Sequence, residues 1–174
     1  MTTIRLATPE DAAPLAALKL AAFRETFIDG FAVPYPAADL ARFEAESYGV
    51  AKVAAELADP THASWVAVEE GGALVAYAHV GPCKLPHRQA SAAQGELYQL
   101  YALNAAQGKG IGKALMTAAL DWLGRAMQGP VWLGVWSGNE RAQAVYARYG
   151  FRKVGEYGFP VGDWTDHEYI FRKD

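Results

Sequence analysis

The sequence has little cysteine, no long apolar run and no excess of positive charge. Its single cysteine, Cys83, has no partner within the chain, which excludes an internal disulfide. No stretch approaches the roughly 18 apolar residues of a membrane span, and the start of the chain lacks the pattern of a secretory signal. With 16 Lys and Arg against 19 Asp and Glu, the formal charge of -3 argues against nucleic-acid binding. These absences favour a soluble, cytoplasmic protein without a membrane or nucleic-acid partner.

The apolar content of the chain indicates a packed core. Hydrophobic residues make up 52% of the 174 residues and aromatic residues 12%, which argues against intrinsic disorder. The length corresponds to about one domain of roughly 150 residues. We therefore expect residues 1–174 to form a single domain that needs neither a disulfide nor a structural metal to be stable.

Local patterns predict strands and helices in a mixed order. Apolar residues recur at helical spacing or alternate along the chain, between capping and turn residues. The expected strands are 3–7, 64–70, 73–80, 96–103, 131–136, 151–157 and 168–172. The expected helices run from about 9 to 26 and over 37–46, 50–57, 111–122 and 139–149, with an irregular connection at 81–94. The order predicts an α/β chain with a mixed sheet, helices on its faces and a mainly helical part over residues 1–60.

A glycine-rich turn, Gln107-Gly108-Lys109-Gly110-Ile111-Gly112-Lys113, lies between a predicted strand and an amphipathic helix. Such a turn brings backbone N–H groups close to an anion, and the helix N-terminus favours phosphate. It is not a P-loop, because Gln107 stands where the first glycine is required and Ala114 where Ser or Thr is required. The dinucleotide fingerprint fails as well, because its third glycine is missing.

Two motifs in this part of the chain resemble the GCN5-related N-acetyltransferase (GNAT) superfamily. The loop motif Gln/Arg-x-x-Gly-x-Gly/Ala is matched at each defined position by Gln107, Gly110 and Gly112. A second segment, Asn-x-x-Ala-x-x-apolar-Tyr-x-x-x-Gly-Phe, is matched by Asn139, Ala142, Val145, Tyr146, Gly150 and Phe151. The resemblance extends over nearly the whole chain. It implies a single domain with a central mixed, mostly antiparallel sheet of six to seven strands, flanked by helices on both faces.

The part from Val131 to about Ile170 is most similar to the PaiA type of spermidine/spermine acetyltransferase. This narrower resemblance is carried by Leu133-Gly134-Val135-Trp136, Gly162-Asp163 and Thr165-Asp166. It implies a polyamine as the first candidate acceptor. From the family we further expect an acetyl-CoA-binding core over residues 94–150, an acceptor side over residues 1–60, and a homodimer.

The resemblance implies acetyl-CoA as co-substrate and assigns residues to it. Strand residues would pair with the pantetheine arm through their backbone, and these are Leu100, Tyr101 and Ala102. Loop residues would bind the pyrophosphate, and these are Gln107, Gly108, Lys109, Gly110, Ile111, Gly112 and Lys113. Asn139 would contact the cofactor, and Tyr146 would be the general acid that returns a proton to the leaving thiolate.

A base is also required, because an alkylamine is mostly protonated at pH 7 and only the neutral amine attacks. Glu96, on the strand that leads to the site, is the candidate. Each proposed role has a structural alternative. Tyr146 fits a core aromatic residue on a helix, Glu96 a solvated or ion-paired strand residue, and Asn139 a helix cap.

Two other chemistries receive no support from the sequence. A nucleophilic Cys83 lacks a histidine that the sequence places beside it. His167-Glu168 begins like a zinc-binding helix motif, but Phe171 stands where the second histidine is required, so no metal is expected.

The leading hypothesis is therefore an acetyl-CoA-dependent N-acetyltransferase that acts on a primary amine of a small molecule by direct attack in a ternary complex. Acceptors other than polyamines are an antibiotic, an amino acid or a protein N-terminus. The alternative from another class is an acyl-CoA-binding module that has lost catalysis.

Overall fold

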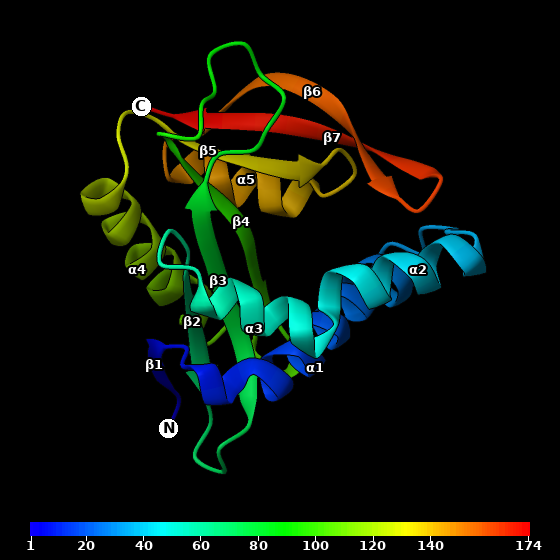
Figure 1. Cartoon of the computed structure of the whole chain (residues 1–174), viewed down its shortest axis with the longest axis vertical. Helices are drawn as coiled ribbons and strands as arrows, with labels where there is room; N and C mark the ends of the chain where they lie inside the picture. Colours follow the sequence, from blue (N-terminus) through cyan, green and yellow to red (C-terminus); the bar gives the residue numbers. More distant parts are fainter.

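The computed structural model describes residues 1–174, and its seven strands form one sheet in the order β1-β2-β3-β4-β5-β7-β6 (Figure 1). The strands are β1 (Thr3–Leu6), β2 (Ala63–Val68), β3 (Leu74–Pro82), β4 (Gly95–Ala102), β5 (Val131–Trp136), β6 (Arg152–Val161) and β7 (Trp164–Lys173). Only β4 and β5 are parallel, and every other pair of neighbours is antiparallel. The predicted mixed, mostly antiparallel sheet in a single domain is confirmed.

Helices cover both faces of this sheet, as predicted. They are α1 (Ala12–Phe23), α2 (Ala37–Tyr48), α3 (Val50–Ala58), α4 (Ile111–Ala126) and α5 (Glu140–Arg148). A π-helix, η2 (Arg24–Gly30), continues α1, and η1 (Pro9–Asp11) and η3 (Asn104–Ala106) are short 3-10 helices. α1 and α3 pack on one face, against Val66 and Tyr77, whereas α4 packs on the other. α2 extends from the first face toward the β6–β7 hairpin (Figure 1). None of the helices is both long and apolar enough to cross a membrane.

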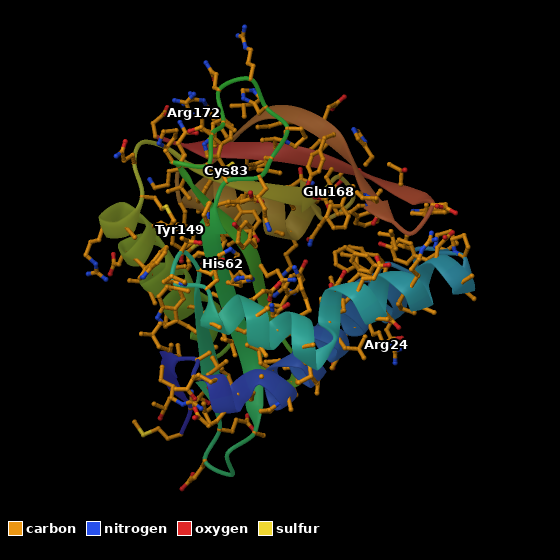
Figure 2. All side chains as sticks on the ribbon, in the orientation of Figure 1. Arg24, His62, Cys83, Tyr149, Glu168 and Arg172 are labelled. Atoms are coloured by element: carbon orange, nitrogen blue, oxygen red, sulfur yellow. The ribbon has the colours of Figure 1, made fainter.

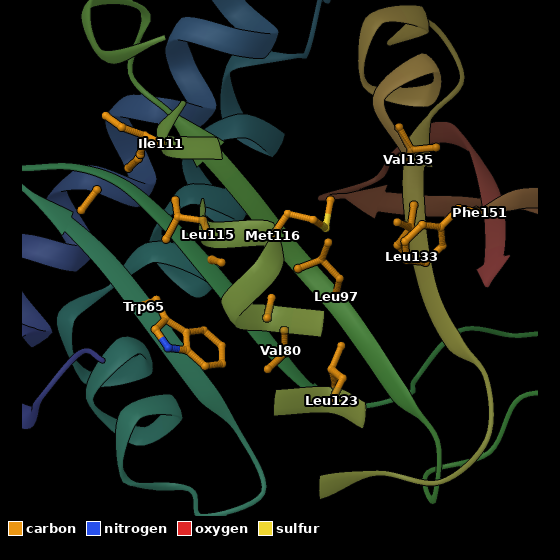
Figure 3. Packing of buried hydrophobic residues seen from close by; sticks show 14 of the residues in the cluster. Trp65, Val80, Leu97, Ile111, Leu115, Met116, Leu123, Leu133, Val135 and Phe151 are labelled. Atoms are coloured by element: carbon orange, nitrogen blue, oxygen red, sulfur yellow. The ribbon is translucent and has the colours of Figure 1, made fainter. Parts of the chain in front are cut away.

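The main hydrophobic core lies between α4 and the sheet (Figure 3). Leu115, Met116 and Ala119 of α4 are fully buried and meet apolar side chains of β3, β4 and β5. Gly95 lets the helix approach closely, because a Cβ on this residue would lie 2.5 Å from Leu123 Cδ2. This packing fixes where α4 begins relative to the strands.

β4 and β5 touch only at their first residues. Gly95 pairs with Val131 and Glu96 pairs with Trp132, after which the two strands diverge (Figure 3). From Leu97 to Ala102 the edge of β4 that faces β5 therefore has no strand partner. An unpaired edge of this kind exposes backbone N–H and C=O groups to a ligand.

The last two strands are longer than the sequence predicted. The sequence predicts strands over 151–157 and 168–172. In the structure β6 extends to Val161, and β7 already begins at Trp164. Gly158 and Pro160 argue against a strand by composition. β6 is the edge strand of the sheet, where proline is tolerated, and Gly162 closes the hairpin with a φ of +62°. The extension carries Asp166 and Trp164 over the face on which α1 and α2 lie.

Candidate active site

A cavity of about 900 Å³ opens where β4 and β5 diverge. It is bounded by these strands, by α5, by the β6–β7 hairpin and by the helical segment from Phe23 to Glu56. The predicted site residues on its wall are Glu96, Leu100, Tyr101, Ala102, Gln107, Gly108, Ile111, Gly112, Asn139 and Tyr146. Lys109, Gly110 and Lys113 belong to the same glycine loop but lie outside the cavity wall. The structure thus brings the predicted cofactor and catalytic residues together around one space.

The glycine loop presents free backbone donors at the start of α4. Gly108 and Gly110 have φ angles of +76° and +78°, which other residues rarely adopt, and Gly110 precedes the first helical residue. The N–H groups from Gly108 to Lys113 donate to no acceptor within the chain. A cradle of free N–H groups at a helix N-terminus, with two lysines in the loop, fits an anion such as the pyrophosphate of acetyl-CoA.

The end of β4 lies beside this loop. The Gln107 side chain donates to the carbonyl of Ala102 at 3.1 Å and accepts a hydrogen bond from Arg141 at 3.2 Å. These contacts join the loop to β4 on one side and to α5 on the other. The unpaired edge of Leu100, Tyr101 and Ala102 therefore runs toward the free N–H groups, an arrangement that fits an extended chain ending in a pyrophosphate.

α5 places Tyr146 in the cavity. Asn139 caps this helix, because its side-chain oxygen accepts the N–H of Ala142 at 3.0 Å, which confirms the structural interpretation of that residue. The Tyr146 ring packs edge-on against Phe151. Its hydroxyl forms no hydrogen bond with another residue, although the residue is half-buried. Burial, together with the charge of Glu168, raises the pKa of Tyr146 to about 12, so the phenol keeps its proton at neutral pH.

Glu96 also lies at the cavity wall, where its carboxylate is neither exposed to solvent nor free of hydrogen bonds. The residue is 7% exposed, and its Oε2 accepts the N–H of Lys84 at 2.7 Å. Burial raises the pKa of Glu96, while hydrogen bonds from Lys84 and the Cys83 thiol act in the opposite direction. This carboxylate ties the irregular connection between β3 and β4 to the sheet. Its role as the base stays a prediction.

Sequence reasoning missed Glu168. This residue lies on β7, on the cavity wall, between the β5–β7–β6 half of the sheet and the helices (Figure 2). Its Oε2 accepts a hydrogen bond from the hydroxyl of Tyr157 at 2.8 Å. Burial is the main cause that raises the pKa of Glu168 to about 7, and the charges of Asp166 and Glu96 add to it. The alternation of Asp166, Glu168 and Ile170 along a strand was the available signal, because alternate residues share one face.

Aromatic side chains form the opposite wall of the cavity. Phe23 contacts Phe27, Tyr35, Phe43 and Tyr48, with ring centroids 5.2–6.1 Å apart. The buried carboxylate of Asp166 accepts hydrogen bonds from Tyr35 at 2.6 Å and from the indole of Trp164 at 2.9 Å. Aromatic faces and carboxylates together favour a ligand with a positively charged group.

The structure does not support a nucleophilic Cys83 or a metal site at His167 and Glu168. Burial raises the pKa of the Cys83 thiol to about 12, which leaves it in the unreactive protonated form. His167 and Glu168 lie on a strand and not on a helix, so they point to opposite faces of the sheet. No three His, Cys, Asp or Glu side chains come close enough together to hold a metal ion.

The chain is similar to known proteins in sequence and in fold. The chain is 26% identical over 154 residues, 88% of each chain, to the uncharacterized N-acetyltransferase in the pepI 3' region of Lactobacillus delbrueckii subsp. lactis. It is 35% identical over 100 residues, 58% of each chain, to the N-alpha-acetyltransferase RimI of Mycobacterium tuberculosis. The crystal structure of the PaiA N-acetyltransferase of Thermoplasma acidophilum with coenzyme A has a TM-score of 0.76 at 18% identity, covering 100% of this chain and 99% of that one.

The family itself follows from the match to a model of known sequences. Residues 20–151, which include the glycine loop, the free edge of β4 and Tyr146, match the model of the acetyltransferase (GNAT) family. This range covers most of the chain and both motifs that line the cavity. The chain therefore belongs to the acetyltransferase (GNAT) family and, by that membership, is an N-acetyltransferase.

Proposed function

We propose that the protein transfers the acetyl group of acetyl-CoA to a primary amine of a small molecule, with a polyamine as the first candidate acceptor. Transfer takes place by direct attack in a ternary complex, and Tyr146 is the proton donor. The observation that carries this proposal is the position of the Tyr146 hydroxyl. The residue is half-buried, and its hydroxyl is protonated and has no hydrogen-bond partner, in the same cavity as the free donors of the glycine loop.

The residues present fit acetyl-CoA. The N–H groups from Gly108 to Lys113 bind the pyrophosphate, with the charges of Lys109 and Lys113 nearby. The edge of β4 at Leu100 to Ala102 pairs with the extended arm in the way that a strand pairs with a peptide. When bound, acetyl-CoA supplies a thioester whose acyl carbon is attacked by the amine and whose thiol leaves.

Tyr146 assists the departure of the thiol. A phenol with a pKa of about 12 is fully protonated at pH 7, so its proton is available for the sulfur that carries the developing negative charge. No residue of the site is required to form a covalent intermediate, and the inert Cys83 agrees with direct transfer.

The acceptor side of the cavity supports a cationic substrate. The buried carboxylates of Glu96 and Asp166 and the half-buried carboxylate of Glu168 lie on its wall, together with aromatic rings of the helical segment. A primary ammonium group is stabilised both by the carboxylates and by the aromatic faces, and a second ammonium group on the same molecule is stabilised in the same way. This arrangement is the reason for placing polyamines before amino acids, antibiotics and peptide N-termini.

The test measures thiol release from acetyl-CoA with a panel of spermidine, spermine, aminoglycosides, amino acids and short peptides. We expect turnover with the polyamines, and we expect Tyr146→Phe to lower kcat by about 100-fold or more while acetyl-CoA still raises the melting temperature. Tyr149→Phe, at the C-terminal cap of the same helix and away from the cavity, is the matched control and keeps its activity.

Each of the other outcomes contradicts a different part of the proposal. Turnover only with peptides would move the acceptor to a protein N-terminus. A thermal shift by acetyl-CoA without turnover on the whole panel would favour an acyl-CoA-binding module. An unchanged kcat in Tyr146→Phe would remove Tyr146 from the role of proton donor.

A further inference from the structure

The carboxylate of Glu168 packs over Gly134 of β5, which has no side chain. A Cβ on Gly134 would lie 2.8 Å from the hydroxyl of Tyr157 and 3.0 Å from Oε2 of Glu168. Any other residue at this position would displace the Glu168–Tyr157 pair. Gly134 on β5 thus leaves room for the carboxylate of Glu168, and Tyr157 on β6 holds it over β5, on the cavity wall.

The carboxylate of Glu168 is free to accept a proton. The hydrogen bond from Tyr157 reaches only Oε2, and the side chain forms no other hydrogen bond and no ion pair. The charged groups that act on it, Asp166 and Glu96, are both negative. A half-buried carboxylate without a counter-ion, on a cavity wall, has an open place for the ammonium of a substrate.

The contacts of Glu96 differ from those of Glu168 in this respect. Glu96 accepts the backbone N–H of Lys84 and lies close to the side chain of that lysine, whose charge favours its ionised form. These interactions indicate a structural role for Glu96, which joins the connection between β3 and β4 to the sheet. They also weaken its drive to take up a proton, because hydrogen bonds to a carboxylate stabilise its charged form.

We propose that Glu168 is the general base that accepts a proton from the ammonium group of the acceptor, and that Tyr157 positions its carboxylate. This inference rests on the proposed function, and names a catalytic residue that neither motif of the family contains. The O–H bond forms on Glu168 as an N–H bond of the ammonium breaks, which leaves a neutral amine to attack.

The protons of the reaction then balance. Tyr146 gives its proton to the sulfur, and the nitrogen returns a proton to the Tyr146 oxygen as the amide forms. The proton held by Glu168 is released to solvent before the next cycle. Glu168 and Tyr146 share the cavity closely enough that the charge of the carboxylate raises the pKa of the phenol.

Several titratable groups lie around Glu168, and a pH profile must distinguish the ionisation of Glu168 from theirs. They come from β6, β7, β4, α5 and the helical segment, and are Tyr157, Asp166, Glu96, Tyr101, Tyr146, Tyr35 and Tyr48. The tyrosines have pKa values raised far above neutrality by burial, so none of them titrates between pH 6 and 8. The carboxylates of Glu168 and Glu96, whose pKa values burial raises, are the groups that the variants must distinguish.

The experiment is the pH dependence of kcat/KM for the best amine, in the wild-type protein and in Glu168→Gln, Glu96→Gln and Tyr157→Phe. We expect an acid limb near pH 7 in the wild type. Glu168→Gln should lower kcat by about 100-fold or more at pH 7.5 and lose this limb, and its activity should rise as higher pH supplies neutral amine. Glu156→Gln, exposed on β6, is the matched control and should keep the wild-type profile.

Tyr157→Phe tests the positioning role and keeps the proposal falsifiable if Glu168→Gln does not fold. The hydroxyl of Tyr157 lowers the pKa of Glu168, so its removal should move the acid limb to higher pH. A merely structural tyrosine would change the rate and leave the limb in place.

The proposal is overturned if Glu168→Gln keeps more than about a third of the wild-type kcat with an unchanged limb. It is also overturned if Glu96→Gln, and not Glu168→Gln, removes the limb, or if Tyr157→Phe leaves the limb in place. A wild-type protein that releases no thiol with any amine would contradict the proposed function first and this inference with it. Binding of acetyl-CoA, followed by thermal shift, should be unchanged in all four variants.

Discussion

Glu168 should destabilise the folded protein above neutral pH, and the replacement Glu168→Gln should relieve that cost. The pKa of its carboxyl is about 7 in the folded chain against an ordinary 4.5. The difference of about 2.5 units corresponds to about 3.4 kcal/mol, at roughly 1.36 kcal/mol per unit. Below pH 4.5 the group is protonated in both states and the cost vanishes.

The sign follows from proton binding. Between pH 4.5 and 7 the folded state binds more protons than the unfolded state, so the free energy of unfolding falls as the pH rises through this window. Glutamine has no charge and can still accept the hydrogen bond of Tyr157. We therefore expect Glu168→Gln to exceed the wild type in stability by about 0.8 kcal/mol at pH 5 and by about 3 kcal/mol at pH 8.

Urea denaturation at these two pH values measures the difference directly. A gain of about 3 kcal/mol at pH 8 also corresponds to a rise in melting temperature of about 6–12 °C for a chain of this length. Glu70→Gln is the control, because this side chain is 91% exposed and should give a difference near zero at both pH values. The same stability difference at pH 5 and pH 8 would refute the raised pKa of Glu168 and the reasoning built on its burial.

Three further substitutions test other parts of the structure. Gly110→Ala places a side chain at a φ of +78° and should cost about 1–2 kcal/mol by urea denaturation while reducing the thermal shift caused by acetyl-CoA. A normal thermal shift would argue against the loop as the pyrophosphate site. Leu115→Ala, at a fully buried position under α4, should cost about 2–5 kcal/mol, and a smaller loss would mean that the core refills the space. Lys19→Met removes the buried partner of Glu56, whose Oε2 lies 2.7 Å from the ammonium, and should cost about 3–5 kcal/mol, whereas the double change with Glu56→Leu should recover most of this loss.

The parts of the fold that local chemistry determines could be predicted from the sequence. Asn139 as a helix cap and the glycines after Gln107 act within a few residues of themselves, so their spacing alone indicated where α5 and α4 begin. The strand 131–136 was predicted with its observed bounds, because a short apolar run after Gly129-Pro130 has few alternatives. Only the match of both motifs to one family indicated that these pieces form a single cavity.

The hairpin of β6 and β7 could not be predicted at its full length. Its distal half contains Gly158, Pro160 and Gly162, which by themselves favour a turn. Residues distant in the sequence keep this half of the hairpin extended. Asp39 of α2 accepts the N–H of Asp163 at 2.9 Å, and the hydroxyl of Tyr35 donates to Asp166. Contacts of this range leave no local signal in the chain.

The same reason explains why Glu168 was missed and Glu96 was found. Glu96 lies on the strand that leads to the glycine loop, whereas the environment of Glu168 is assembled from three strands. β7 inserts between β5 and β6, and only this order brings Gly134 beneath the carboxylate and Tyr157 beside it. A residue whose chemistry depends on sheet order cannot be recognised from its neighbours in the sequence.

The raised pKa of Glu168 is what makes it effective as a base. A primary alkylamine has a pKa of about 10.4, so proton transfer to a carboxylate of pKa 4.5 costs about 8 kcal/mol and transfer to one of pKa 7 about 4.6 kcal/mol. A turnover of about 10 per second corresponds to a total barrier of about 16 kcal/mol. The buried site thus raises the supply of neutral amine by about 300-fold over an ordinary glutamate. The stability lost by burying the carboxylate, about 3.4 kcal/mol, is equal to the free energy that the same burial contributes to proton transfer, because one pKa shift determines both.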